Sequence, residues 1–181
     1  MNGIFFEEFL EMIESDYGSE LVEGIIIDFD GIGIFDSHYD YPYAQFDELM
    51  NLVGHVVRRS VSDLKKCFGE YLFSRLVILY RPEFAGNSDI FEFLEHLEKL
   101  IHDRIQTYFP SVSIKNFSSQ RVSDNTFQVT YQTKSEHIDL AIGLFMGCQK
   151  FFNEELLLNT EFLPNKNSIV KFTLSKNQVL I

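Results

Sequence analysis

The chain has 181 residues, 45% of them hydrophobic and 15% aromatic, and 15 Lys and Arg against 27 Asp and Glu give it a formal charge of −12. This length and composition suit one globular domain with a sizeable core, and no apolar run reaches the roughly 18 residues of a membrane-spanning helix. The acidic balance argues against nucleic acid or anionic lipid as a partner, because both require a basic surface. The N-terminus lacks the basic region of a secretory signal peptide, so we expect a cytoplasmic protein.

Apolar residues recur at helical spacing through the first part of the chain. Ile residues at 25–27 also allow a strand, and the Gly- and Asp-rich stretch 28–43 predicts a long loop. Ser60 or Ser62 is expected to cap the fourth helix and Ser88 the fifth. The spacing predicts helices over residues 3–14, 19–27, 44–58, 62–80 and 89–109, with Arg81-Pro82 ending the fourth and Pro110 the fifth.

The periodicity changes to that of strands after residue 110. An apolar helix over 137–153 interrupts the strands and carries Gly143 and Gly147, whose spacing allows another backbone or a flat ligand to approach closely. Helices followed by strands with one inserted helix define an α+β fold. Strands are predicted over 112–117 and 119–134, with a turn at Asp124-Asn125, and a closing hairpin over 156–163 and 168–174, with a turn at Pro164-Asn165.

The acidic charge is concentrated at one end of the chain. Residues 1–50 contain 13 acids and no Lys or Arg, whereas the rest of the chain carries 14 acids and 15 bases. Such a surface can steer a basic partner protein towards it. A face that only keeps the protein soluble explains the pattern equally well, so both interpretations stay open.

The sequence lacks several common catalytic motifs. There is no Gly-rich phosphate loop, no nucleophile elbow and no HExxH motif, so we do not expect an enzyme. Cys67 and Cys148 lack the CxxC spacing of a zinc site and are expected to be two buried free thiols.

His102 lies at the margin of an apolar helical stripe. A helical His is usually a partly buried or solvated side chain, although a neutral imidazole in an apolar wall is also what haem iron requires.

Several segments, taken in order, resemble the haem nitric oxide/oxygen-binding (H-NOX, or HNOB) family. The resemblance covers essentially the whole chain, although no single segment is decisive. The segments are Met1–Gly3 with the following helix and Tyr17-Gly18, Phe68–Tyr71, Leu100–Arg104 with Tyr108–Pro110, Phe117, Val129–Thr133, Ile142–Gly147 and Phe151-Phe152.

The resemblance implies a bacterial, stand-alone H-NOX domain spanning residues 1–181. A helical N-terminal lobe over 1–60 is expected to pack on an α+β lobe over 61–181, which contains a small antiparallel sheet and further helices. Haem b is expected between the two lobes.

The resemblance also assigns residues to the haem. His102 matches the proximal iron ligand, and Tyr131 and Thr133 match the first two positions of the propionate motif Tyr-x-Ser-x-Arg. Ser135 stands in place of the motif Arg, so the forked, charge-assisted clamp on a propionate is missing. Two alternatives follow: haem is held with weaker propionate contacts, or this chain has lost haem.

The predicted distal side is apolar. Family members that bind oxygen stably carry a Tyr three residues before the glycine that matches Gly143, and here that position is Leu140. NO and CO need little help from a hydrogen-bond donor, so we expect the pocket to bind them and to discriminate against O₂. The alternative is that these side chains are simply core. The other pocket residues are expected to be Phe5, Phe9, Leu72 and Leu144.

The family relationship implies a sensor that weakens its iron–His102 bond when NO binds. Gly69 and Gly143 are candidate joints between moving helices, or simply points of close packing. The chain ends at Ile181 without a kinase or cyclase segment, so the expected partner is a separate histidine kinase or cyclic-di-GMP enzyme. A haem-free interaction module with the same fold is the alternative function.

Overall fold

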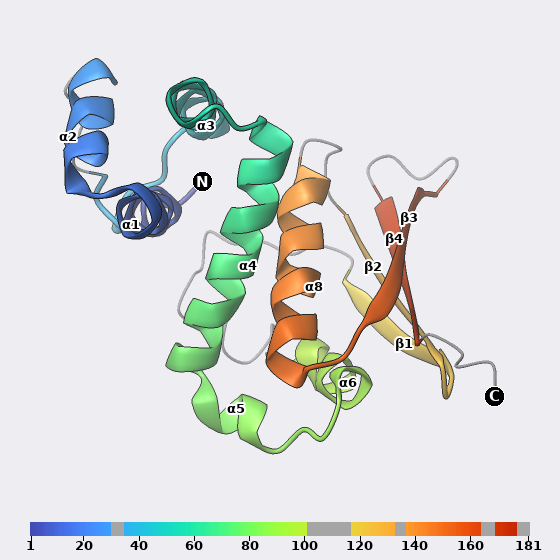
Figure 1. Cartoon of the computed structure of the whole chain (residues 1–181). Coiled ribbons are helices and arrows are strands. Elements are labelled where there is room, and N and C mark those ends of the chain that lie inside the picture. Colours follow the sequence, from blue (N-terminus) through green and yellow to red (C-terminus); the bar gives the residue numbers. More distant parts are fainter. Residues whose placement is uncertain (30–34, 101–116, 133–136, 164–168, 177–181) are drawn as a thin grey trace.

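The computed structural model describes residues 1–29, 35–100, 117–132, 137–163 and 169–176. Its α+β architecture confirms the predicted fold class (Figure 1). The helices are α1 (Ile4–Tyr17), α2 (Ser19–Asp28), α3 (Tyr43–Val57), α4 (Val61–Leu79), α5 (Arg81–Ala85), α6 (Ile90–Leu100) and α8 (Ile138–Phe152). The strands are β1 (Ser118–Ser123), β2 (Thr126–Gln132), β3 (Leu156–Phe162) and β4 (Ile169–Lys176).

Local chemistry explains where the first helices begin and end. α1 ends at Gly18, whose φ of 91° is a left-handed conformation that favours glycine. α2 is helical throughout, so the alternative of a strand at 25–27 is wrong. Ser60 is the cap of α4, because its hydroxyl accepts a hydrogen bond from the Asp63 N–H at 3.0 Å. Pro82 ends α4 as predicted but also lies in the first turn of α5, where a missing N–H costs nothing.

The cap of α6 differs from the prediction. Asp89 accepts the hydrogen bond from the Glu92 N–H at 2.8 Å, whereas Ser88 donates its hydroxyl to the Glu92 carboxylate at 2.6 Å. Asp89 is therefore the capping side chain, one residue later than expected. Local sequence could not distinguish the two residues, because Ser and Asp are equally suitable caps. The remainder of the predicted helix, residues 101–109, lies outside the described residues.

The sheet is fully antiparallel, with strand order β1-β2-β4-β3. Asp124-Asn125 forms the turn between β1 and β2, as predicted, while the segments 112–116 and 164–168 lie outside the described residues. Phe127 and Val129 of β2 are buried on one face. Val129 is paired with Phe172 of β4, which is also buried, so the register brings the apolar residues of both strands to the same side.

Among the described residues, two hydrophobic clusters form the core. The first joins α1, α2, α3 and the beginning of α4, and the second joins the rest of α4 with α5, α6, α8 and the sheet. Figure 1 shows α8 between α4 and the sheet, with α1 to α3 on the opposite side of α4. α4 therefore contributes to both clusters, while the division of the chain into lobes at residue 60 stays a prediction.

Two glycines allow α4 and α8 to touch. A Cβ atom on Gly143 would lie 2.1 Å from the Lys66 carbonyl oxygen and 2.9 Å from the Gly69 Cα. On Gly147 it would lie 2.7 Å from the Phe73 Cβ. The close approach predicted for this spacing is thus to the backbone of a neighbouring helix. No helix within the described ranges is long and apolar enough to cross a membrane.

Candidate functional site

A largely apolar cavity lies beside the second cluster. Its volume is about 370 Å³, within the range of small-molecule sites. Its walls come from α1, from the start of α3, from the second half of α4, from α5, α6 and β2, and from α8. Aromatic and aliphatic side chains form most of the surface, among them Phe73, Leu76, Phe93, Leu94, Val129 and Phe145.

The structure brings together five of the nine predicted site residues. One further predicted residue, Phe9, does not line the cavity: it is fully buried in the first cluster, with its ring centroid 5.3 Å from that of Phe68. His102, Thr133 and Ser135 lie outside the described residues. The five residues that line the cavity are Phe5, Leu72, Tyr131, Leu140 and Leu144.

Tyr131 reaches the cavity from the end of β2. Its ring is stacked on that of Phe172 from the neighbouring strand, with centroids 5.8 Å apart and planes 8° from parallel. The ring of Phe145 in α8 packs against the same Phe172 ring, with the two centroids 5.1 Å apart. These aromatic contacts orient the Tyr131 ring at the cavity wall. His137, at the start of α8, also lines the cavity, and its ring lies 4.1 Å from that of Tyr43.

Two charged residues in the cavity wall were not identified from the sequence. Glu8 of α1 accepts two hydrogen bonds from Arg75 of α4, at 2.7 Å from Nε and 3.0 Å from Nη2. The hydrogen bonds that Arg75 donates to Glu8 raise the pKa of its guanidinium. Helical spacing offered a signal, because Glu8 follows Phe5 and Arg75 follows Leu72 by three residues each. The pairing itself joins residues 67 positions apart and is not local information.

The two cysteines have different environments. Cys148 is buried and lines the cavity, and burial raises the pKa of its thiol well above the usual range. Cys67 is only partly buried, and the Arg59 guanidinium lies 3.3 Å from its sulfur. Both are free thiols, as predicted, but the expectation that both are buried is wrong for Cys67, because α4 turns this position towards a groove at the surface.

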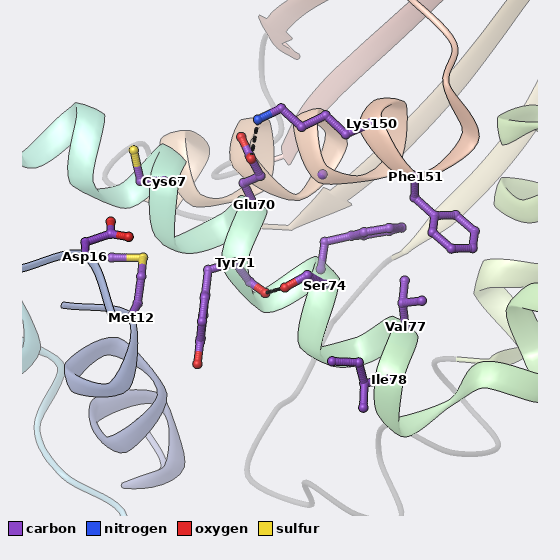
Figure 2. A pocket seen from close by; sticks show the side chains of 12 residues that line it. Met12, Asp16, Cys67, Glu70, Tyr71, Ser74, Val77, Ile78, Lys150 and Phe151 are labelled. Atoms are coloured by element: carbon purple, nitrogen blue, oxygen red, sulfur yellow. Dashed lines mark hydrogen bonds and ion pairs between the residues drawn. The ribbon is translucent and has the colours of Figure 1, made fainter. Parts of the chain in front are cut away.

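That groove is a second hollow, formed by α1, α4 and α8, of about 650 Å³. Figure 2 shows Met12 and Asp16 of α1 on one side of α4 and Lys150 and Phe151 of α8 on the other. An ion pair between Glu70 and Lys150 crosses it. The groove mixes charged with apolar side chains, whereas the lining of the cavity is mainly apolar apart from a few polar side chains such as Glu8 and Arg75. We therefore take the cavity as the candidate ligand site.

Comparison with known proteins identifies the family. A sequence profile described as haem-NO-binding (HNOB) matches residues 2–160, so this chain belongs to the HNOB, or H-NOX, family. The unliganded Fe(II) H-NOX protein from K. algicida is 26% identical, with a TM-score of 0.80 over 100% of this chain and 99% of that one. No curated protein matches the chain.

Two further solved structures share the fold. The S. oneidensis H-NOX protein in its Fe(II)NO state is 16% identical, with a TM-score of 0.82 over 98% of this chain and 100% of that one. The IWP-051-bound H-NOX from Shewanella woodyi in its Fe(II)CO state is 24% identical, with a TM-score of 0.80 over 98% and 95%. The predicted resemblance is therefore confirmed.

Family membership defines the class of protein as a haem-based gas sensor and not an enzyme. The cavity fits such a cofactor, because an apolar porphyrin needs apolar walls and polar groups only where its propionates meet water. Tyr131 is a hydroxyl donor in the wall, and the remaining surface is mainly hydrocarbon. Within the described ranges, no cluster of three or more His, Cys, Asp or Glu side chains is arranged to hold a metal ion.

Proposed function

We propose that this protein senses NO, and also binds CO, at a five-coordinate ferrous haem b whose proximal ligand is His102. The observation that supports the proposal most strongly is the cavity itself. Phe5, Leu72, Leu140 and Leu144 converge on it from three helices that are far apart in the sequence. Haem bound there supplies the iron that coordinates the gas, and the chain supplies the apolar enclosure.

Gas selectivity in this proposal follows from the apolar side chains. Leu140 offers no hydrogen-bond donor. Family members that bind oxygen stably resemble one another in having a Tyr at this position. Phe5, Leu72 and Leu144, which also line the cavity, offer none either. A gas that gains little from a donor, such as NO or CO, is then favoured over O₂.

Propionate binding is the weakest part of the expected site. Tyr131 and Thr133 would hold the propionates, and Ser135 replaces the Arg of the family motif. A hydrogen bond to a charged group contributes about 1.5–3 kcal/mol. Losing the Arg fork should therefore weaken haem binding without abolishing it, because apolar burial of the porphyrin contributes separately.

Signalling would begin when NO weakens the bond between iron and His102 and thereby releases the helix predicted over residues 89–109. We place the joint at the contact between α4 and α8, where Gly69 and Gly143 bring the two backbones together. The partner in this proposal is a histidine kinase or cyclic-di-GMP enzyme in a bacterial cytoplasm. Exposed acids on α1 and α2, including Glu14, Asp16 and Glu20, support a docking face for a basic surface.

The alternative is a haem-free interaction module that regulates the same kind of partner by contact alone. Ser135 in place of the motif Arg is the specific observation that favours it, because this substitution removes the strongest expected contact with a propionate. The two functions differ in one property, which is whether the purified protein takes up haem.

The visible spectrum of the reduced protein, purified with haem supplied and then exposed to NO, CO or air, tests the proposal. We expect a Soret band that shifts with NO and CO and leaves no stable oxygen complex. His102→Gly should lose this spectrum and regain it with added imidazole, which can replace the missing ligand. His96→Gly is the matched control, because His96 is an exposed residue of α6, the described part of the same predicted helix. Wild-type protein that takes up no haem would leave only the haem-free module.

A further inference from the structure

The cavity wall contains a salt bridge between α1 and α4 that an apolar gas pocket does not require. Glu8 and Arg75 both line the cavity, and the two oxygens of the carboxylate accept two hydrogen bonds from the guanidinium at 2.7 and 3.0 Å. The Glu8 side chain is only 14% exposed, compared with 37% for Arg75. The carboxylate is therefore the buried partner, and the guanidinium lies nearer to the rim.

The position of the pair relative to the apolar wall is significant. Glu8 lies one turn of α1 after Phe5, and Arg75 lies one turn of α4 after Leu72. Phe5 and Leu72 belong to the distal wall in the function proposed above. The guanidinium thus carries up to five hydrogen-bond donors on the same side of the cavity as the gas site.

A cation in that position would change which gas the pocket favours. Of the three gases, dioxygen draws the most electron density when a ferrous haem holds it, and it gains most from a positively charged donor. Arg75 without a carboxylate partner would be such a donor, because a guanidinium stays protonated and has donors to satisfy. Pairing it with a fixed carboxylate neutralises the charge and directs two of its donors, on Nε and Nη2, to Glu8.

We propose that Glu8 is a positioning residue for gas selectivity: it holds the Arg75 guanidinium at the rim and so keeps the distal side free of a cationic donor. This inference rests on the function proposed above. Glu8 acts only through Arg75, so its removal should matter only while Arg75 is present.

The surroundings of the pair favour this role. Glu11, one turn further along α1, lies 3.5 Å from the same guanidinium but is 57% exposed and does not line the cavity. The Tyr71 hydroxyl donates to Glu11 at 3.3 Å, and burial beside Glu8 and Glu11 raises the pKa of Tyr71 to about 12. Arg75 therefore pairs with two acids of α1, closely with Glu8 at the cavity wall and more loosely with the exposed Glu11. Residues 1–50 contain no Lys or Arg that would compete for Glu8 within its own part of the chain.

The test compares Glu8→Leu with Glu11→Leu in the haem-loaded protein. Glu8→Leu removes the anchor and keeps the wall filled, whereas Glu11→Leu makes the same change on the same helix outside the cavity. The readouts are the C–O stretching frequency of the reduced CO complex and the O₂ affinity. For Glu8→Leu we expect a lower stretching frequency, from the freed positive charge, and an O₂ affinity increased about tenfold, the effect of one charge-assisted hydrogen bond.

Two further variants separate positioning from a structural role. Arg75→Leu alone should keep the wild-type stretching frequency, because the guanidinium is already held away from the gas. Glu8→Leu combined with Arg75→Leu should return the frequency to that value. A wild-type frequency in Glu8→Leu, an equal shift in Glu11→Leu, or a shift that persists in the double variant would overturn the inference.

The same experiment distinguishes this inference from the function on which it rests. Wild-type protein without haem overturns both. Wild-type protein that binds haem and CO, together with an unresponsive Glu8→Leu variant of normal helix content, overturns only the role of Glu8.

Discussion

The two hydrophobic clusters differ in whether their buried side chains also line the cavity. None of the buried residues of the first cluster lines the cavity, where only its partly buried neighbours Phe5, Leu72 and Leu140 reach the wall. Buried residues of the second cluster form part of that wall, such as Phe73, Phe93 and Phe145. Phenylalanine dominates both clusters. The same residue type therefore fills one core and encloses a cavity beside the other, and composition alone does not distinguish these two uses.

Ring geometry shows how the first cluster becomes filled. The Phe6 ring is stacked on Phe35 at 4.2 Å and meets the edge of Phe46 at 5.0 Å, and Phe9 continues the network to Phe68. Such edge and stacked contacts leave little space between rings. In the second cluster, aromatic rings from the sheet, α8 and α6 surround the cavity. The comparison teaches that the cavity lies where helices and sheet meet.

The largest expected loss of stability comes from truncating a ring in the closely packed first cluster. Phe68→Ala should lower the free energy of unfolding by about 3–5 kcal/mol, because a fully buried ring leaves a void among close-packed neighbours. Phe145→Ala should cost less, about 2–3 kcal/mol, because one side of this ring faces the cavity and makes fewer contacts with packed protein. Urea unfolding of both variants in the same haem-loading state measures the difference. Equal losses would contradict the distinction between a core that is packed on all sides and one that borders the cavity.

The contact that joins the two regions gives the next effect. Gly143→Ala should destabilise the protein by about 1–3 kcal/mol, because the new methyl group would meet the Lys66 carbonyl oxygen of α4. Gly24→Ala is the matched control: it lies within α2 with open space around it and should stabilise the protein by about 0.5–1 kcal/mol. Thermal melts of both variants measure these effects. A neutral Gly143→Ala variant would show that α4 and α8 can separate freely.

A smaller effect concerns the cap of α6 in the second region. Asp89→Ala should cost about 1 kcal/mol. The hydrogen bond from the Glu92 N–H, followed by the charge of Lys176, lowers the pKa of Asp89 below its ordinary value of 3.8. The charged form therefore adds stability that is fully present above that ordinary value and is lost as pH falls towards the lower folded-state pKa. Asp89→Asn should keep most of the cap but weaken this acid dependence, which unfolding curves below pH 4 would reveal.

The smallest effect is expected at the ion pair across the surface groove. Lys150→Gln should change stability by about 1 kcal/mol or less, because Lys150 is 68% exposed and water competes for its charge. The difference between wild type and variant should shrink further at high salt. A larger, salt-independent loss would mean that the groove between α4 and α8 contributes as much to stability as the cores do.

Local patterns predicted most of the elements. Period-3.6 spacing placed α1, α3 and α4 within a few residues, and the alternation of Phe127 and Val129 placed β2. The errors occurred where neighbouring residues satisfy the same local rule. Ser88 and Asp89 are both good caps, and the geometry of α6 selected Asp89. Pro82 both ends a helix and begins the next one, which periodicity does not anticipate.

The candidate site was only partly predictable. The order of family-like segments pointed to Phe5, Leu72 and Leu140, and these residues line one cavity. Phe9 was expected beside them, but it lies on the face of α1 that packs into the first cluster. One turn of a helix decides between the two faces, and an apolar residue satisfies either environment.

The sequence by itself determined the fold class, the family, the absence of a recognised catalytic motif and the acidity of the N-terminal region, because periodicity, motif order and charge are properties of the chain. Only the tertiary structure decided that the second cluster borders a cavity and that Glu8 meets Arg75 in its wall. Both depend on the approach of α1, α4 and α8. That approach is set by the small residues Gly69 and Gly143 and by the packing of the whole core, which no local pattern encodes.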